Sequence, residues 1–289
     1  GLYGGYSHSL ATTQEVKTAE KLKELFPFVN TWKFLKTGAE ACAAAVKFAK
    51  AATGREKVIS HGYHGFHETH FTPHIIEYKD FSQIDDSTAA VIIEPVIVED
   101  SPENLDWLKS LRAKCYKHGA LLIFDEIVTG FRFKDYSVAR RYGIDPDLFI
   151  IGKAMANGMP LAAVGGRSAI MANPKAFVSS TYAGEVLSLK ACEAVCDIVQ
   201  RNSDFRVSDI WSEGAKFIKR FNAQDTTVKI KGYPTRGIFT GDPAQVATFM
   251  ESMVKAKILF CKSWFFTWGH IPEMDETLER HKLPKWLKK

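Results

Sequence analysis

The sequence has 289 residues, of which 46% are hydrophobic and 25% are charged. This balance is typical of a globular chain with room for one large and one small domain, and it excludes a disordered or fibrous protein. The 38 Lys and Arg residues exceed the 33 Asp and Glu residues by only five, with no basic arm and no long apolar stretch. We therefore expect neither a nucleic-acid partner nor a membrane span.

The cysteines indicate the redox setting. There are five of them, an odd number without framework spacing, which predicts reduced thiols and a cytoplasmic protein. Cys192 and Cys196 are one helical turn apart on an apolar face, so we expect them in the core rather than at a metal.

Helical patterns alternate with short apolar runs, which predicts an α/β fold with a mainly parallel central sheet flanked by helices. The expected helices cover residues 14–25, 39–53, 104–118, 185–201 and 244–257. The expected strands cover residues 31–35, 89–94, 121–126, 148–151, 227–230 and 237–240. We expect an N-terminal helical segment at residues 1–30, a large domain at 31–200 and a small C-terminal α/β domain at 201–289.

Ligands of open α/β sheets bind where the strands end, and four motifs lie at such ends. The first is KTGAE, residues 36–40, between an expected strand and an Ala-rich helix. A glycine at this junction lets backbone N–H groups and the helix dipole face an anion such as a phosphate. A tight turn with Thr37 as the helix cap explains the motif alone equally well.

The second and third motifs are Asp125-Glu126, at the end of LLIFDE, and Gly152-Lys153. Asp125 ends the apolar run LLIFD, and a carboxylate there requires a cation. A protonated pyridine nitrogen, a structural salt bridge or a metal ion would each satisfy it. Lys153 follows the run DLFIIG; desolvation would lower its pKa and make it a nucleophile toward an aldehyde, although a lysine after a strand is usually solvent-exposed.

The fourth motif is HGYHGFHETH, residues 61–70, with histidines at 61, 64, 67 and 70. Imidazoles are common metal ligands, but this spacing suits neither a helix face nor a strand, and the glycines indicate a loop. We favour an aromatic-rich cofactor loop over a metal site. Tyr63 is the candidate to stack on a planar ring.

Together these motifs resemble the class III aminotransferases of fold type I, in particular the glutamate-1-semialdehyde aminomutase-like branch. The matching segments run in family order and are TGAEACAAAVKFAKAATGREKV, GYHGFH, VIIEPV, GALLIFDEIVTGFR, YGIDPDLFIIGKAMANGMPLAAVGG and STYAGEVLSLKA, with GYPTRGIF in the small domain. The resemblance implies the pyridoxal 5'-phosphate (PLP) transferase fold and PLP as the cofactor.

The resemblance also implies roles for the residues around the cofactor ring. Lys153 resembles the lysine that forms the Schiff base and carries the proton during transfer. Asp125 matches the partner of the pyridine nitrogen. Ile127 matches the aliphatic residue under the ring, and Tyr63 the aromatic on the opposite face.

The phosphate contacts are likewise carried over from the family. Thr37, Gly38 and Ala39 fall on the phosphate-binding turn, where Ala39 replaces the usual Ser or Thr and leaves only its backbone N–H. Thr181 matches the threonine that reaches the phosphate of the neighbouring subunit, which implies a homodimer. Glu94 falls on the glutamate of the family's Glu-Pro segment and belongs to the cofactor set.

Substrate recognition is less well matched. Glu99 lies where some ω-amino-acid transaminases carry a gating glutamate, and Arg236 is a candidate carboxylate binder or a surface salt bridge. The arginine expected late in the small domain is not seen near residues 264–271, and we expect the long N-terminal segment of family members to be missing.

The expected activity is amino transfer between an amine or amino acid and a carbonyl acceptor, through a Schiff base on Lys153. An aminomutase would use the same residues within one substrate. A shortened PLP-binding pseudoenzyme and, more remotely, a zinc hydrolase built on the histidine loop are the rival hypotheses.

Overall fold

The computed structural model describes residues 12–67, 73–201, 207–224, 227–259 and 261–267. The chain forms two compact units. The first comprises residues up to 97 and from 103 to 202, and the second comprises residues 98–102 and those from 203 onward. The expected N-terminal helical segment thus belongs to the first unit, and a short loop of the expected large domain belongs to the second.

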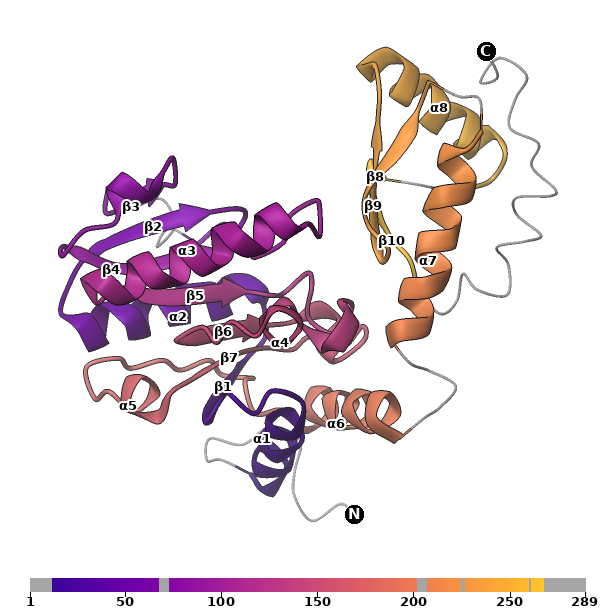
Figure 1. Ribbon diagram of the computed structural model, residues 1–289. Coiled ribbons are helices and arrows are strands. Elements are labelled where there is room, and N and C mark those ends of the chain that lie inside the picture. Colours follow the sequence, from indigo (N-terminus) through magenta and orange to yellow (C-terminus); the bar gives the residue numbers. More distant parts are fainter. Residues whose placement is uncertain (1–11, 68–72, 202–206, 225–226, 260, 268–289) are drawn as a thin grey trace. The chain divides into compact units, whose positions relative to one another are not determined.

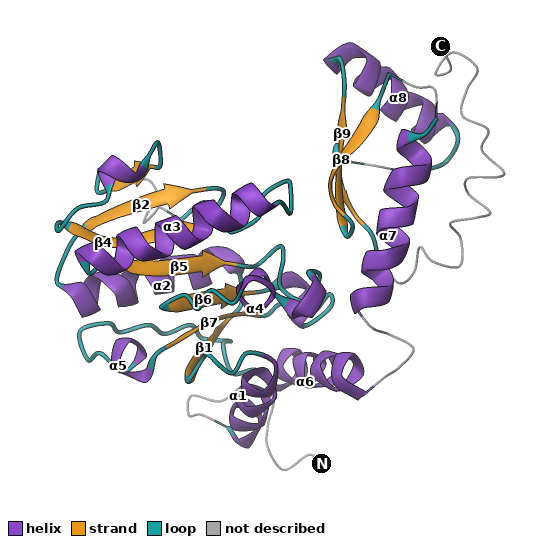
Figure 2. Ribbon diagram, in the orientation of Figure 1, coloured by secondary structure: helices purple, strands orange, loops and turns teal. Residues whose placement is uncertain are grey.

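The first unit is built on a seven-stranded sheet (Figures 1 and 2). Its strands are β1 (Thr31–Leu35), β2 (Lys57–His61), β3 (Ile75–Glu77), β4 (Thr88–Ile93), β5 (Leu121–Asp125), β6 (Leu148–Ile151) and β7 (Ala162–Gly166). The spatial order is β1-β7-β6-β5-β4-β2-β3. Among these strands only β7 runs antiparallel to its neighbours, which are β1 and β6. The other six point the same way, which confirms the mainly parallel α/β fold.

Helices cover this sheet. They are α1 (Thr13–Leu25), α2 (Gly38–Thr53), α3 (Pro102–His118), α4 (Val138–Tyr142), α5 (Ser168–Met171) and α6 (Val186–Arg201). Short 3-10 helices are η2 (Phe81–Gln83), η3 (Lys134–Tyr136) and η4 (Lys153–Met155). Figure 1 shows α2 behind the sheet and α3 in front of it.

The ends of α2 follow from three residues. The Thr37 side chain accepts from the Glu40 N–H while the Glu40 carboxylate accepts from the Thr37 N–H, a capping box that begins the helix. Gly54 ends it with φ of 68°, a left-handed conformation that glycine adopts without strain.

Alternate strand residues face the two sides of the sheet. Ile92, Ile123 and Ile150 belong to the apolar cluster that also holds the buried face of α2. Phe149, the residue before Ile150 on β6, packs instead with Phe26 at the end of α1. The sheet is therefore covered on both faces, which leaves its strand ends as the place for a ligand.

The second unit is a smaller α/β structure. It contains α7 (Val207–Asn222), β8 (Lys229–Tyr233), β9 (Arg236–Thr240), α8 (Pro243–Lys255) and β10 (Ser263–Phe265). The strands pair antiparallel in the order β10-β9-β8. The strand expected at residues 227–230 is shifted toward the C-terminus, because its pairing with β9 runs from Lys229 to Tyr233.

Among the described residues, no helix combines the length and the apolarity that a membrane crossing needs. All five cysteines are free thiols, and only Cys261 is exposed.

Candidate active site

Five strands that point the same way bring the sequence motifs to one edge of the large sheet. The segments that follow β1, β2, β4, β5 and β6 begin with Lys36, Gly62, Glu94, Glu126 and Gly152. Asp125 is the last residue of β5 and pairs with Ile150 of the neighbouring β6. Lys153 comes two residues after the end of β6, at the same edge of the sheet. This edge is where an open parallel sheet binds ligands.

Asp125 is the centre of a buried polar network. Its Oδ2 is 2.8 Å from His64 Nδ1 and accepts from Cys42 Sγ at 3.2 Å. Its Oδ1 accepts from the Ile127 N–H at 3.1 Å. Burial, followed by the charge of Asp125, raises the pKa of the Cys42 thiol well above its usual value. Cys42 is therefore a neutral donor, and the carboxylate is held by groups that carry no permanent charge.

Lys153 begins η4 in a left-handed conformation, with φ of 46°. Partial desolvation lowers the pKa of its ammonium group, and the negative charge of Asp125 opposes this shift. Arg132 lowers the pKa further, while Glu94 acts in the same direction as Asp125. A lysine in this setting releases its proton more readily than a free lysine and becomes a better nucleophile.

The start of α2 offers two backbone donors. Among the described residues, the N–H groups of Gly38 and Ala39 have no recorded protein acceptor, as expected for the first turn of a helix. Gly38 lies against Ile127, because a Cβ at Gly38 would be 2.5 Å from Ile127 Cδ1. Gly65 likewise lies against Ala39, at 2.4 Å between the added Cβ and the Ala39 Cβ. The two glycines let the neighbouring loops approach the turn closely.

Glu94 and Tyr63 are linked at the ends of β4 and β2. Glu94 Oε1 accepts from the Tyr63 N–H at 2.8 Å. The Tyr63 side chain is 71% exposed, so this bond fixes the backbone of the loop and leaves the ring available. The pKa of His61 is lowered mainly by burial, and its ring packs 5.6 Å from both Tyr78 and Trp107.

The described histidines of the loop have separate surroundings. His61 packs in this aromatic cluster, the His67 ring stacks on Phe66, and His64 faces Asp125. His70 lies outside the described residues. Within the described chain, the groups close enough to share a metal are Cys42, His64 and Asp125, which already form hydrogen bonds with one another.

Three other candidate residues lie elsewhere. Thr181 is exposed on the segment that precedes α6, and Ser180 beside it donates to Glu40 Oε1 at 3.4 Å. Glu99 and Arg236 both belong to the second unit. Arg236 Nε donates to Ser263 Oγ at 3.4 Å, which connects β9 to β10. Glu99 lines a polar hollow of about 470 Å³ together with Trp211 and Lys231.

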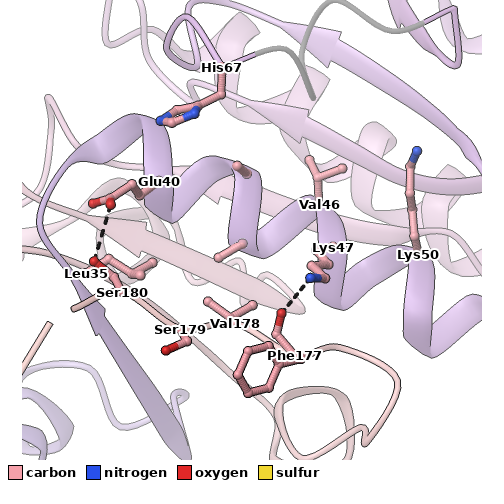
Figure 3. A pocket seen from close by; sticks show the side chains of 12 residues that line it. Leu35, Glu40, Val46, Lys47, Lys50, His67, Phe177, Val178, Ser179 and Ser180 are labelled. Atoms are coloured by element: carbon pink, nitrogen blue, oxygen red, sulfur yellow. Dashed lines mark hydrogen bonds between the residues drawn. The ribbon is translucent and has the colours of Figure 1, made fainter. Parts of the chain in front are cut away.

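A hollow of about 490 Å³ runs along α2, next to the segment that carries Thr181 (Figure 3). Phe177 lines it and is 78% exposed, although its carbonyl accepts from Lys47 Nζ at 2.5 Å. This hollow reaches Leu35, the last residue of β1, and presents an apolar surface beside the first residues of α2.

Two residues of the network were not assigned roles from the sequence. Cys42 was given no role from the sequence, and His64 was considered only as a member of the histidine loop. His64 is adjacent to Tyr63 and Cys42 is three residues after Ala39, yet their contact with Asp125 depends on how α2 and the loop cross the sheet. The one signal for Cys42 is its place one turn inside α2, on the face toward β5.

The model of the family described as "Aminotransferase class-III" matches residues 67–257. A glutamate-1-semialdehyde 2,1-aminomutase from Neisseria gonorrhoeae (strain NCCP11945) is 33% identical over 238 residues, which cover 68% of this chain and 56% of that protein. The chain thus spans about half the length of this curated relative.

Solved structures share the fold. An omega-transaminase from Sphaerobacter thermophilus superposes with a TM-score of 0.82 at 19% identity, covering 96% of this chain and 79% of that one. The FumI protein of Sphingopyxis sp. MTA144, in its PLP internal aldimine form, superposes with a TM-score of 0.85 at 23% identity. That superposition covers 95% of this chain and 75% of the other.

Proposed function

The chain belongs to the class III aminotransferase family, and from this premise we propose that it binds PLP at Lys153 and transfers amino groups. The observation that carries the proposal is the pair formed by Asp125 and Lys153 at the ends of neighbouring parallel strands. A buried carboxylate and a lysine of lowered pKa suit the two ends of a pyridine aldehyde.

The residues at this edge fit the chemical groups of PLP. The Asp125 carboxylate suits a protonated ring nitrogen, because its own partners carry no permanent charge. The N–H groups of Gly38 and Ala39 at the positive end of α2 suit a phosphate. Thr37 Oγ1 adds a hydroxyl next to them.

When bound, PLP supplies an aldehyde that condenses with amines and a ring that accepts electrons. Asp125 would keep the proton on the ring nitrogen, which makes the ring a better electron acceptor. Lys153 Nζ would hold the aldehyde before the substrate arrives and would afterwards carry the proton that the substrate loses and regains.

The remaining cofactor residues would orient the ring. The family positions assign Ile127 and Tyr63 to its two faces, and Glu94 to the loop that holds Tyr63. The Glu94 bond to the Tyr63 N–H supports this assignment, because it fixes the loop while the tyrosine ring stays exposed. An aromatic ring stacked on the cofactor would contribute about 0.5–1.5 kcal/mol.

We also propose a homodimer in which Thr181 reaches the phosphate of the partner's site. Thr181 is exposed between two exposed aromatic residues, Phe177 and Tyr182. Exposed apolar side chains beside the hollow along α2 favour burial against a second copy (Figure 3). The reduced thiols favour the cytoplasm as its location.

The substrate is an amine or amino acid and its partner a carbonyl compound. Glu99 is the proposed gate and Arg236 the proposed carboxylate contact. Aminomutation within one substrate is the second candidate, and the 33% identity to a glutamate-1-semialdehyde aminomutase favours it.

Amine donors test the proposal directly. The PLP-loaded protein is mixed separately with α-amino acids, ω-amino acids and simple amines, and absorbance follows conversion of the cofactor to its pyridoxamine form. We expect at least one class to convert it. Glutamate 1-semialdehyde is offered alone in parallel, because an aminomutase would isomerise it without a second substrate.

Lys153→Ala should abolish the conversion, and Lys175→Ala, which changes an exposed lysine after α5, should leave it intact. Conversion that survives the loss of Lys153 would overturn the proposed mechanism. A protein that binds PLP but converts it with none of the donors would be the pseudoenzyme instead.

A further inference from the structure

The side chain of Lys36 has an unusual set of partners. Its Nζ donates to Glu185 Oε1 at 2.9 Å, to the Pro160 carbonyl at 3.1 Å and to Ser188 Oγ at 3.3 Å. The Lys36 side chain is only 13% exposed and that of Glu185 only 10%. All three protons of the ammonium group are therefore directed at acceptors of the protein rather than at water.

Lys36 and its acceptors lie on segments that carry proposed cofactor residues. Lys36 itself immediately precedes the turn of Thr37, Gly38 and Ala39. Pro160 closes the loop that follows Lys153, and Glu185 lies four residues after Thr181. One ammonium group thus connects three separate parts of the proposed PLP site.

Glu185 is itself fixed from the other side. Its Oε2 accepts from the Leu187 N–H at 2.9 Å and its Oε1 from the Ser188 N–H at 2.9 Å, so it caps the start of α6. Burial would raise the pKa of Glu185, but the hydrogen bonds from Ser188 and Lys36 outweigh it and lower the pKa. An ionised, immobile carboxylate is a rigid anchor for the Lys36 ammonium group.

A second connection runs parallel to the first. Glu40 Oε2 accepts from the N–H groups of Lys36 and Thr37, both at 2.9 Å, and Glu40 Oε1 accepts from Ser180 Oγ (Figure 3). The backbone of the turn is thereby held in place through Glu40, and its position relative to α6 through Lys36.

Stability alone does not account for this arrangement. A buried ion pair loses about as much in desolvation as it gains in attraction, so an apolar pair of the same size would serve the fold equally well. An ion pair with several fixed hydrogen bonds does specify one geometry. Backbone donors to a phosphate need such a geometry, because hydrogen bonds weaken steeply with misalignment.

We propose that Lys36 is a positioning residue that aligns the N–H groups of Gly38 and Ala39 for the cofactor phosphate. This inference rests on the proposed function, since the phosphate is that of PLP. Lys36 acts through Glu185 and Pro160 and does not itself touch the ring. Its effect is confined to the phosphate and does not extend to the aldehyde or the ring nitrogen.

The test compares PLP with pyridoxal, which has the same ring and aldehyde but no phosphate. Affinities of the apoprotein for both compounds are measured by absorbance titration for the wild type, Lys36→Met and Glu185→Gln. Lys117→Met is the matched control, because Lys117 is an exposed lysine in the last turn of α3, the helix that precedes the start of β5.

We expect Lys36→Met and Glu185→Gln to weaken PLP binding by about tenfold, which corresponds to the loss of about one hydrogen bond. Both variants should bind pyridoxal within twofold of the wild-type affinity. Lys117→Met should behave as wild type. A folded Lys36→Met that keeps the wild-type preference for PLP would overturn the inference, as would equal losses for both compounds.

If Lys36→Met does not fold, Glu185→Gln decides, since it keeps the shape of the side chain and removes its charge. Failure of the proposed function gives a different result, because the wild type would then bind neither compound at Lys153.

Discussion

Two buried aspartates lie at opposite ends of the large sheet, and their partners differ in kind. Asp147 precedes β6 at the amino edge, and it accepts from Arg112 Nη1 at 2.7 Å, from Arg167 and from the Leu122 N–H. Asp125 ends β5 at the carboxyl edge, where its side-chain partners are His64 and Cys42.

The difference separates a structural carboxylate from one available to a ligand. Two guanidinium groups are always charged, so they neutralise Asp147 completely and leave it no need for another cation. The Cys42 thiol and the His64 imidazole contact Asp125 without a permanent positive charge, so the carboxylate can still pair with a cation. The same residue type, equally buried, therefore supports the fold at one edge and can hold a protonated ring at the other.

The largest expected effect contrasts the two aspartates. Asp125→Asn should lower the rate of amino transfer by about a thousandfold, because the ring nitrogen loses the carboxylate that keeps it protonated. Asp147→Asn should change the rate per folded molecule by less than about threefold. Steady-state rates, normalised to active sites, measure both. Equal losses at the two positions would remove the distinction between the edges.

The second effect concerns stability. Asp147→Ala leaves the buried Leu122 N–H without its acceptor and removes the shared partner of Arg112 and Arg167, and it should lower the free energy of unfolding by about 2 kcal/mol. Urea unfolding of the first unit measures it. The matched variant Asp106→Ala removes an exposed carboxylate near Lys109 on α3 and should cost less than about 0.5 kcal/mol. Similar costs would mean that burial of the pair has no energetic consequence.

Glu126 is a third buried carboxylate, and no cationic side chain pairs with it in the part of the chain that the structure describes. It accepts from the N–H groups of Val138 and Ala139 and from Thr129 Oγ1. Burial raises its pKa to about 7, against the donors that would lower it. Because an unfolded glutamate titrates near pH 4.5, the folded state binds more protons than the unfolded state between pH 4.5 and 7.

The free energy of unfolding contributed by Glu126 therefore falls as pH rises through this window and is constant outside it. The total fall is at most about 3 kcal/mol. Glu126→Gln cannot ionise at this position. The free energy of unfolding of the wild type should therefore fall relative to that of the variant as pH rises from 5 to 7. Thermal unfolding at a series of pH values measures it, and a constant difference would contradict the raised pKa.

The smallest effect concerns Cys42. Cys42→Ala removes one of two donors to Asp125 Oδ2 while His64 remains, so PLP affinity should change by less than about tenfold. Cys42→Ser keeps a donor and should change it less. If Cys42→Ala lowered PLP affinity as much as Asp125→Asn does, the thiol and not the imidazole would be the main partner of the carboxylate.

Local signals were sufficient for much of the fold. The strands Thr31–Leu35 and Leu148–Ile151 were predicted to the residue, because each is an apolar run bounded by polar or glycine residues. The strand Ala162–Gly166 was missed, since AAVGG contains mostly small residues that resemble a loop. It forms a strand only because β1 and β6 supply hydrogen-bond partners on both sides.

For the candidate site as well, some residues could be placed from local patterns and others could not. Asp125 and Lys153 could be placed from the sequence because each follows a recognisable buried strand. The contacts of Asp125 with Cys42, and of Lys36 with Glu185, join residues 83 and 149 positions apart. Such pairs depend on the rotation of α2 and on the path of the segment before α6, which no local pattern encodes.

The most direct test of the central claim is the site of cofactor attachment. The protein is incubated with PLP, reduced with borohydride and digested, and the modified peptide is identified by mass spectrometry. We predict a visible absorption band before reduction and a single label on Lys153. No band, or a label spread over exposed lysines, would contradict a PLP site at this edge of the sheet.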